Sequence, residues 1–244
     1  MKPEAAGRGA GVVDFSRLHA CIVDLDGTLV DTLGDFEVAL NHMLAALSRP
    51  PVSRAVIEQM VGKGSEHLIR SVLAHVEALR GNSGFVVSSA LFDEAWQAYQ
   101  RHYLLINGHH SVVYPGVVEG LQALQGAGLR LACLTNKPGA FARPLLEAKG
   151  LDVFFTEVFG GDAFERKKPD PLPLLQTCAA LGSEAGRTLM IGDSSNDAQA
   201  ARAAGCPVVL VSYGYNHGQP IRAVDADGYL DSLAELAPRL GGGA

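Results

Sequence analysis

The chain alternates between two hydrophobic patterns, and the change between them predicts how it is organised. Short apolar runs with little polar alternation occur at residues 20–23, 129–134, 153–159, 188–191 and 208–211. Such runs are typical of parallel strands that are covered on both faces. Helical spacing of apolar residues follows several of them, at residues 116–126, 171–181 and 197–204. Repeated strand–helix units predict an α/β fold with a doubly wound, Rossmann-like parallel sheet.

Residues 34–110 carry a different pattern. Apolar residues recur there every three or four positions, as at Leu68, Ile69, Val72 and Leu73, without a convincing strand pattern. This spacing is typical of amphipathic helices. The predicted organisation is a flexible tail at residues 1–14, an α/β core at 15–33 and 111–240, and an inserted all-helical cap at 34–110.

Composition narrows the function classes. The chain has 244 residues, a net charge of −6 and no long basic run, which argues against a general nucleic-acid binder. No apolar run approaches the ~18 residues of a membrane span, and the first residues lack a signal-peptide core. The four cysteines are scattered without zinc-type spacing, which favours reduced cysteines and a cytoplasmic location. The sequence leaves monomer and homodimer open.

The ends of the predicted strands carry the candidate chemistry, because ligands of doubly wound sheets bind outside those ends. Asp24 and Asp26 follow the first strand, and a spacing of two puts both carboxylates on one side of an extended chain. Two such carboxylates ~4 Å apart repel by roughly 4 kcal/mol at an effective dielectric near 20. The pair therefore needs a cation or a shared proton, unless both residues only cap a turn.

The other strand ends add complementary groups. Thr135 ends the second strand and can donate a hydrogen bond to an oxyanion, and Lys168 is held before a proline. Asp193 and Asp197 flank the end of the fourth strand. Taken singly, these residues also fit a helix cap, a solvated basic turn and a capping aspartate. Together, carboxylates without a histidine favour Mg²⁺ over zinc, and a metal with one lysine suits a phosphoryl group.

Four strings, in chain order, resemble the four motifs of the haloacid dehalogenase superfamily. They are DLDGTLVDT, LTN, KKPDP and GDSSNDAQAARAAG, and the resemblance spans about residues 18–236. The helical insert directly after the first string resembles the C1 cap of that family. The resemblance implies the α/β core described above and hydrolysis through a covalent aspartyl intermediate.

The resemblance also implies roles for individual residues. Asp24 would be the nucleophile that attacks phosphorus, and Asp26 would be the acid and base that serves the leaving group and then water. Thr135, Asn136 and Lys168 would bind the phosphoryl group. Dehalogenases and phosphonoacetaldehyde hydrolases of the family lack a carboxylate at the position of Asp26, so the resemblance favours a phosphatase.

The same resemblance implies how Mg²⁺ would be held. The side chains of Asp24 and Asp193 and the main-chain carbonyl of Asp26 would be ligands. Asp197 would lie at or behind the metal shell. Mg²⁺ is the only cofactor expected, and a small phosphorylated metabolite is the expected partner.

Substrate choice is expected to lie in the helical insert. The loop Gly62-Lys63-Gly64 precedes a helix and exposes backbone N–H groups that suit an anion, and Arg70 lies one helical turn further. This loop, with residues 211–221 and 231–233, is similar to bacterial phosphoglycolate phosphatases. The expected reaction is hydrolysis of 2-phosphoglycolate to glycolate and phosphate.

Three alternatives stay open at this point. One is another capped phosphatase of the family, acting on sugar phosphates or on pyrophosphate. A second is an isomerase of the β-phosphoglucomutase type, which also keeps Asp26. The third is a catalytically silent binding module, against which the intact set of Asp24, Asp26, Lys168 and Asp193 argues.

Overall fold

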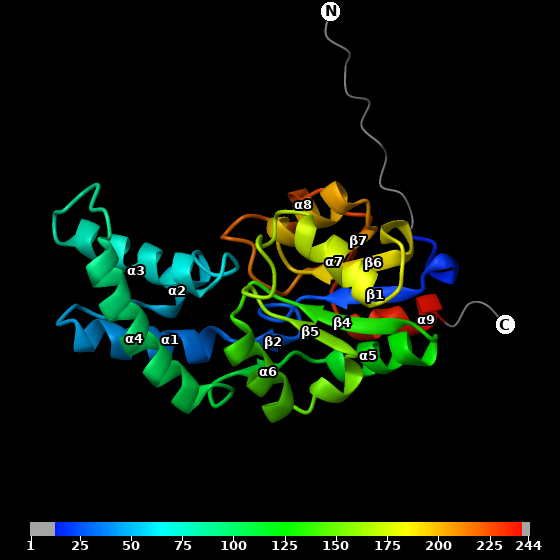
Figure 1. Ribbon diagram of the computed structural model, residues 1–244, viewed down its shortest axis with the longest axis horizontal. Coiled ribbons are helices and arrows are strands. Elements are labelled where there is room, and N and C mark those ends of the chain that lie inside the picture. Colours follow the sequence, from blue (N-terminus) through cyan, green and yellow to red (C-terminus); the bar gives the residue numbers. More distant parts are fainter. Residues whose placement is uncertain (1–12, 241–244) are drawn as a thin grey trace, which may run out of the picture.

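A computed structural model describes residues 13–240 of the chain (Figure 1). Most of the predicted tail, residues 1–12, lies outside the described residues; Val13, at its end, packs against the core. The core is a parallel sheet of six strands in the order β5-β4-β1-β6-β7-β8. The strands are β1 (Ala20–Val23), β4 (Arg130–Leu134), β5 (Glu157–Phe159), β6 (Thr188–Gly192), β7 (Val208–Val211) and β8 (Gly228–Leu230). The predicted doubly wound α/β fold is confirmed.

Helices cover both faces of the sheet, as Figure 1 shows. They are α5 (Val117–Gly126), α6 (Gly139–Ala148), α7 (Leu172–Ala180), α8 (Ser195–Ala204) and α9 (Leu236–Leu240). Cys21 and Val23 of β1 belong to an apolar cluster with α5, α6 and α9. Ala20 and Ile22 face the other way, into a cluster with α7 and α8. The absence of polar alternation in β1 thus reflects burial on both faces.

Two strands differ from the sequence prediction. The run at 153–159 begins as a 3-10 helix, because the backbone N–H of Phe155 bonds to the carbonyl of Asp152, and only Glu157–Phe159 forms β5. The edge strand β8 was not predicted, since its three residues include a glycine and no apolar run. The 3-10 helices are η1 (Phe15–Arg17), η2 (Asp152–Phe154), η3 (Ala185–Arg187), η4 (Ile221–Ala223) and η5 (Leu233–Glu235).

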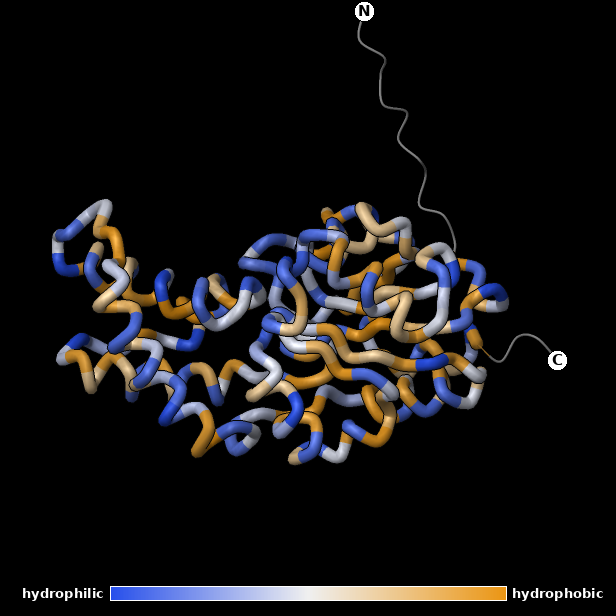
Figure 2. The backbone as a smooth tube through the Cα atoms, viewed as in Figure 1, coloured by the Kyte–Doolittle hydropathy of each residue, from blue (hydrophilic) through white to orange (hydrophobic). Residues whose placement is uncertain are grey.

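Four helices between β1 and α5 form a lobe beside the core, which we call the helical lobe (Figure 1). They are α1 (Leu33–Ala46), α2 (Arg54–Glu58), α3 (Ser65–Leu79) and α4 (Ser89–Ile106). The lobe has its own apolar cluster, in which Phe36, Ile69 and Tyr99 are buried. Figure 2 shows hydrophobic residues along the strands of the core and on the lobe helices. Within residues 13–240, no helix has the length and apolarity that a membrane crossing requires.

Two connections join the lobe to the core. The short strands β2 (Val30–Asp31) and β3 (Val112–Val113) pair in antiparallel fashion where the chain leaves and returns. Beside them, the buried carboxylate of Asp35 in α1 accepts bonds from the backbone N–H groups of Gly108 and His110, each at 2.7 Å, and from the Ser111 hydroxyl. Asp35 therefore fixes the start of the lobe to its end.

Candidate active site

The first two carboxylates of the site stand at the end of β1. The backbone N–H of Asp24 bonds to the carbonyl of Ile191 at 2.9 Å, so the residue continues the sheet ladder. Asp24 is 9% exposed, and the side chain of Asp26 is 12% exposed. Gly27 then turns the chain at φ 85°, where a Cβ atom would lie 2.0 Å from Oδ2 of Asp193. Only glycine allows the chain after β1 to approach the end of β6 this closely.

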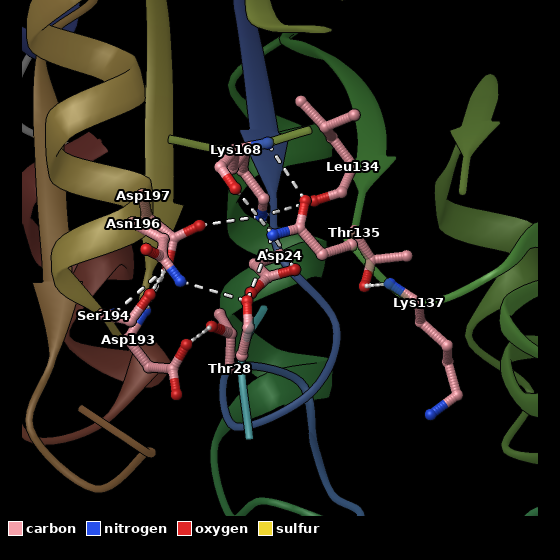
Figure 3. A network of polar contacts seen from close by, with 12 residues as sticks. Asp24, Thr28, Leu134, Thr135, Lys137, Lys168, Asp193, Ser194, Asn196 and Asp197 are labelled. Carbon is pink, nitrogen blue, oxygen red and sulfur yellow. Dashed lines mark hydrogen bonds and ion pairs between the residues drawn. The ribbon is translucent and has the colours of Figure 1, made fainter. Parts of the chain in front are cut away.

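Lys168 is the centre of the polar network in Figure 3. Its Nζ atom lies 2.9 Å from Oδ1 of Asp24 and 2.7 Å from Oδ1 of Asp197, and it donates to the carbonyl of Leu134 at 2.8 Å. The side chain is 2% exposed. Burial alone would lower the pKa of Lys168, but Asp197 and Asp24 raise it above its ordinary value. The lysine is therefore a permanent positive charge that links β1, β4 and α8.

Asp193 and Asp197 come from the end of β6 and the start of α8. Oδ1 of Asp193 accepts from the Thr28 hydroxyl at 3.3 Å, and Oδ2 accepts from the backbone N–H of Tyr215 at 2.5 Å. Oδ2 of Asp197 accepts from the hydroxyl of Ser194 at 2.7 Å and closes a capping box. Asp197 thus both caps α8 and contacts Lys168, so its capping and site roles are not alternatives.

Three buried carboxylates gather around one lysine. Asp24, Asp193 and Asp197 each place an oxygen within 4.8 Å of the others. Burial raises the pKa of Asp24 to about 7, opposed by Lys168 and aided by Asp197. Burial, Asp197 and Asp24 also raise the pKa of Asp193 well above its usual range. When ionised, the three carboxylates carry more negative charge than Lys168 offsets, and their donors are all oxygens, so the cluster is chemically suited to a hard divalent cation.

A second feature of Asp24 fits a divalent cation. Its Oδ1 atom is fully buried and, within the described part of the chain, makes no hydrogen bond of good geometry beyond the ion-pair contact with Lys168. A buried carboxylate oxygen with spare lone pairs is costly unless another positive group completes its environment.

Thr135 and Asn136, which follow β4, make different kinds of contact. The Thr135 side chain is buried, and its hydroxyl accepts from the backbone N–H of Lys137 at 3.1 Å. The Asn136 side chain holds backbone atoms instead: it accepts from Lys168 N at 3.1 Å and donates to the carbonyls of Lys168 at 2.9 Å and Gly62 at 3.1 Å. Asn136 therefore joins the Lys168 loop to the lobe loop.

A small enclosed cavity of ≈ 20 Å³ lies between core and lobe. It is lined by Asp24, Asp26, Phe36, Val61, Gly62, Gly64, Ser65, Leu68, Thr135, Asn136 and Lys137. The cavity has room for about one water molecule, so a larger ligand needs more space than this arrangement gives. Four residues predicted from the sequence thus line the same cavity: Asp24, Asp26, Thr135 and Gly62.

Two predicted substrate residues lie elsewhere. Lys63 is exposed and, with Arg70, lines an open groove outside the cavity. The Arg70 guanidinium pairs with Glu66 at 3.2 Å and lies 4.0 Å from the ring centroid of Phe92. Both contacts lie within the lobe, so they indicate a structural role for Arg70.

Sequence reasoning missed Lys137. Its Nζ atom lies 2.8 Å from Oδ1 of Asp26, and its side chain is 1% exposed. Phe36 and Tyr103 of the lobe place their rings 4.4 and 4.9 Å from the same nitrogen. The available signal was its place directly after Thr135 and Asn136, on a loop already assigned to the site.

Comparison with known proteins defines the class. The family model described as haloacid dehalogenase-like hydrolase matches residues 21–211, and the chain belongs to this family. A phosphoglycolate phosphatase of Thiobacillus denitrificans is 44% identical over 220 residues, which cover 90% of this chain and 94% of that protein. A phosphoglycolate phosphatase of Nitrosospira multiformis is 42% identical over 89% of this chain and 93% of its own length.

A solved structure agrees with these relatives. The crystal structure of a protein described as a predicted phosphoglycolate phosphatase from Haemophilus somnus superposes with a TM-score of 0.86 at 32% identity. The match covers 91% of this chain and 97% of that one. The resemblance stated from the four motifs is confirmed at the level of the family.

Proposed function

We propose that the chain is a Mg²⁺-dependent phosphate monoester hydrolase that converts 2-phosphoglycolate to glycolate and phosphate. The observation that carries this proposal is the buried Asp24, paired with Lys168 at 2.9 Å, in an enclosed cavity that Asp26 and Thr135 also line. The names of the relatives from Thiobacillus denitrificans and Nitrosospira multiformis support the choice of substrate.

The first half of the reaction transfers the phosphoryl group to the protein. A carboxylate oxygen of Asp24 attacks phosphorus, and the bond from phosphorus to the glycolate oxygen breaks. The carboxyl proton of Asp26 passes to that leaving oxygen. Lys168 and the Thr135 hydroxyl neutralise the charge on the phosphoryl oxygens, which is where such catalysis needs positive groups.

The second half returns the protein to its starting state. Asp26, now a carboxylate, takes a proton from water as the water oxygen attacks phosphorus. The bond from phosphorus to the Asp24 oxygen breaks, and phosphate leaves with Asp26 protonated again. Dividing a difficult displacement into two steps suits phosphate monoesters, which are among the slowest esters to hydrolyse in water.

The acidic cluster fits Mg²⁺. The Asp24 and Asp193 side chains and the main-chain carbonyl of Asp26 would hold the ion, with Asp197 at or behind this shell. When bound, Mg²⁺ offsets the charge that the carboxylates and the phosphoryl group bring together. Asp24 can then approach an anionic substrate with less repulsion, while Lys168 keeps its carboxylate oriented.

Two features of the surroundings bear on location and on access of water to the site. The four cysteines are buried and free, in line with a cytoplasmic location. The lobe closes the cavity over Asp24, and exclusion of water strengthens each charge interaction inside. A small metabolite is the partner that such a space favours.

The test is phosphate release from a panel of esters with Mg²⁺. The panel contains 2-phosphoglycolate, several sugar phosphates, pyrophosphate and p-nitrophenyl phosphate, with Asp24→Asn as control. We expect kcat/KM for 2-phosphoglycolate to exceed the others by about a hundredfold, which is about 2.7 kcal/mol. A flat profile that Asp24→Asn abolishes would keep the phosphatase and reject the substrate. Release from no ester would reject both.

A further inference from the structure

We infer that Lys137 forms a second anion subsite, which binds the carboxylate of the substrate while Lys168 serves the phosphoryl group. This inference rests on the proposed function and names how its substrate is recognised. Lys137 is buried and lines the cavity, but neither step of the proposed hydrolysis uses it.

The environment of Lys137 is costly without a further anion. Its ammonium group has three N–H donors and one hydrogen-bonded carboxylate, that of Asp26 at 2.8 Å. The remaining sides face the rings of Phe36 and Tyr103, at 4.4 and 4.9 Å from the ring centroids. Aromatic faces hold a cation but accept no conventional hydrogen bond, so donors remain for a ligand.

Two hydroxyls in the same neighbourhood lack partners. The Tyr103 hydroxyl is buried and has no hydrogen-bond partner among the described residues. The same holds for Tyr99, whose ring stacks on that of Tyr103 with centroids 5.3 Å apart. Buried polar groups without partners mark places where a water molecule or a ligand completes the network.

Lys168 and Lys137 extend toward different parts of the site. Figure 3 shows Lys168 within the aspartate cluster, whereas the Lys137 side chain extends away from that cluster. Lys168 already contacts Asp24 and Asp197. A substrate with a carboxylate next to its phosphate brings a second negative charge, and Lys137 is the buried cation that lines the cavity on the Asp26 side.

The same contacts allow a simpler role, in which Lys137 only holds Asp26 in place. The two roles differ in what they predict. A subsite for a carboxylate acts only on substrates that carry one, whereas a support for Asp26 acts on every ester. A phosphate ester of the same shape without the carboxylate charge therefore separates them.

The experiment uses the full chain with Mg²⁺ and compares 2-phosphoglycolate with 2-phosphoglycolamide, in which a neutral amide replaces the carboxylate and the phosphate is unchanged. We expect the unaltered protein to prefer the carboxylate by about 30-fold or more in kcat/KM. Lys137→Met should lose about 100-fold on 2-phosphoglycolate, mainly through KM, and at least tenfold less on the amide. Lys167→Met, an exposed neighbour, is the control and should keep the preference.

Equal losses on both esters would overturn the subsite and leave the proposed function intact. If Lys137→Met does not fold, Lys137→Gln and the unaltered protein still decide, because a preference below about threefold overturns the inference. Release from neither ester by the unaltered protein would instead reject the proposed function, and the subsite with it.

Discussion

The Nζ atom of Lys168 lies 2.9 Å from Oδ1 of Asp24, and this contact joins the third motif of the chain to the first. The same nitrogen lies 2.7 Å from Oδ1 of Asp197, so one ammonium group pairs with carboxylates from the end of β1 and the start of α8. Removing either the cation or one of its carboxylates leaves a buried charge without its partner. Stability and activity are therefore coupled at this point.

Lys168→Met should cost both activity and stability. It leaves Asp24 and Asp197 buried without their cation, which destabilises by about 3 kcal/mol in the absence of metal. Activity should fall about a thousandfold, because the phosphoryl group loses a neighbouring positive charge and Asp24 loses the group that orients it. Urea unfolding and phosphate release measure the two effects, with Lys167→Met as control. An unchanged free energy of unfolding in Lys168→Met would show that the contact contributes little to stability.

Gly27→Ala should weaken metal binding more than folding. A Cβ atom at residue 27 would lie 2.0 Å from Oδ2 of Asp193, so that carboxylate must move. We expect the Mg²⁺ concentration for half-maximal activity to rise about tenfold or more. The control is Gly126→Ala, where a Cβ atom meets nothing within 4 Å. Equal Mg²⁺ dependence in both variants would contradict the predicted clash between a Cβ atom at residue 27 and Asp193.

Mg²⁺ should raise the melting temperature of the chain in the absence of substrate. At a hundred times its dissociation constant, a ligand of the folded state stabilises by about 2.7 kcal/mol, or roughly 5–10 °C in a domain of this size. Asp193→Asn should remove most of that increase, and Asp93→Asn, on the exposed side of α4, should not. A melting temperature that neither Mg²⁺ nor a chelator changes would argue against the metal site.

Asp35→Ala should loosen the junction between core and helical lobe. It removes the acceptor for the N–H groups of Gly108 and His110 and for the Ser111 hydroxyl. Leaving these donors unsatisfied costs about 3 kcal/mol, which urea unfolding detects. Asp93→Ala should stay within ~0.5 kcal/mol of the unaltered protein, since its side chain is exposed. Equal stability of the two variants would show that Asp35 does not fix the junction.

The fold was predictable where burial dictates composition. The strands β1, β6 and β7 are buried on both faces, so their residues are apolar without alternation. The edge strand β8 has only three residues and gains its place from pairing with β7, which no local pattern records. The 3-10 turn at Asp152–Phe154 also depends on local backbone bonds rather than hydropathy.

The site was predictable where one residue type suits one chemistry. Carboxylates and a lysine at strand ends led to Asp24, Asp193 and Lys168, which the structure brings together. Asn136 was expected to bind the phosphoryl group, as the family resemblance implies, and Lys137 was not singled out. The Asn136 amide bonds to the backbone of Lys168 and Gly62. Lys137 contacts Asp26 and lies against the aromatic ring of Phe36 from the lobe. Both depend on contacts between segments far apart in the chain.

The most direct test of the account is whether Asp24 becomes phosphorylated. The chain is mixed with 2-phosphoglycolate and Mg²⁺ and quenched in acid within the first turnover. It is then digested, and the masses of its peptides are measured by mass spectrometry. We predict one phosphoryl group on the peptide that contains Asp24, labile to hydroxylamine, and neither this adduct nor turnover in Asp24→Asn. Near-normal phosphate release by Asp24→Asn would contradict the assignment of Asp24 as the nucleophile.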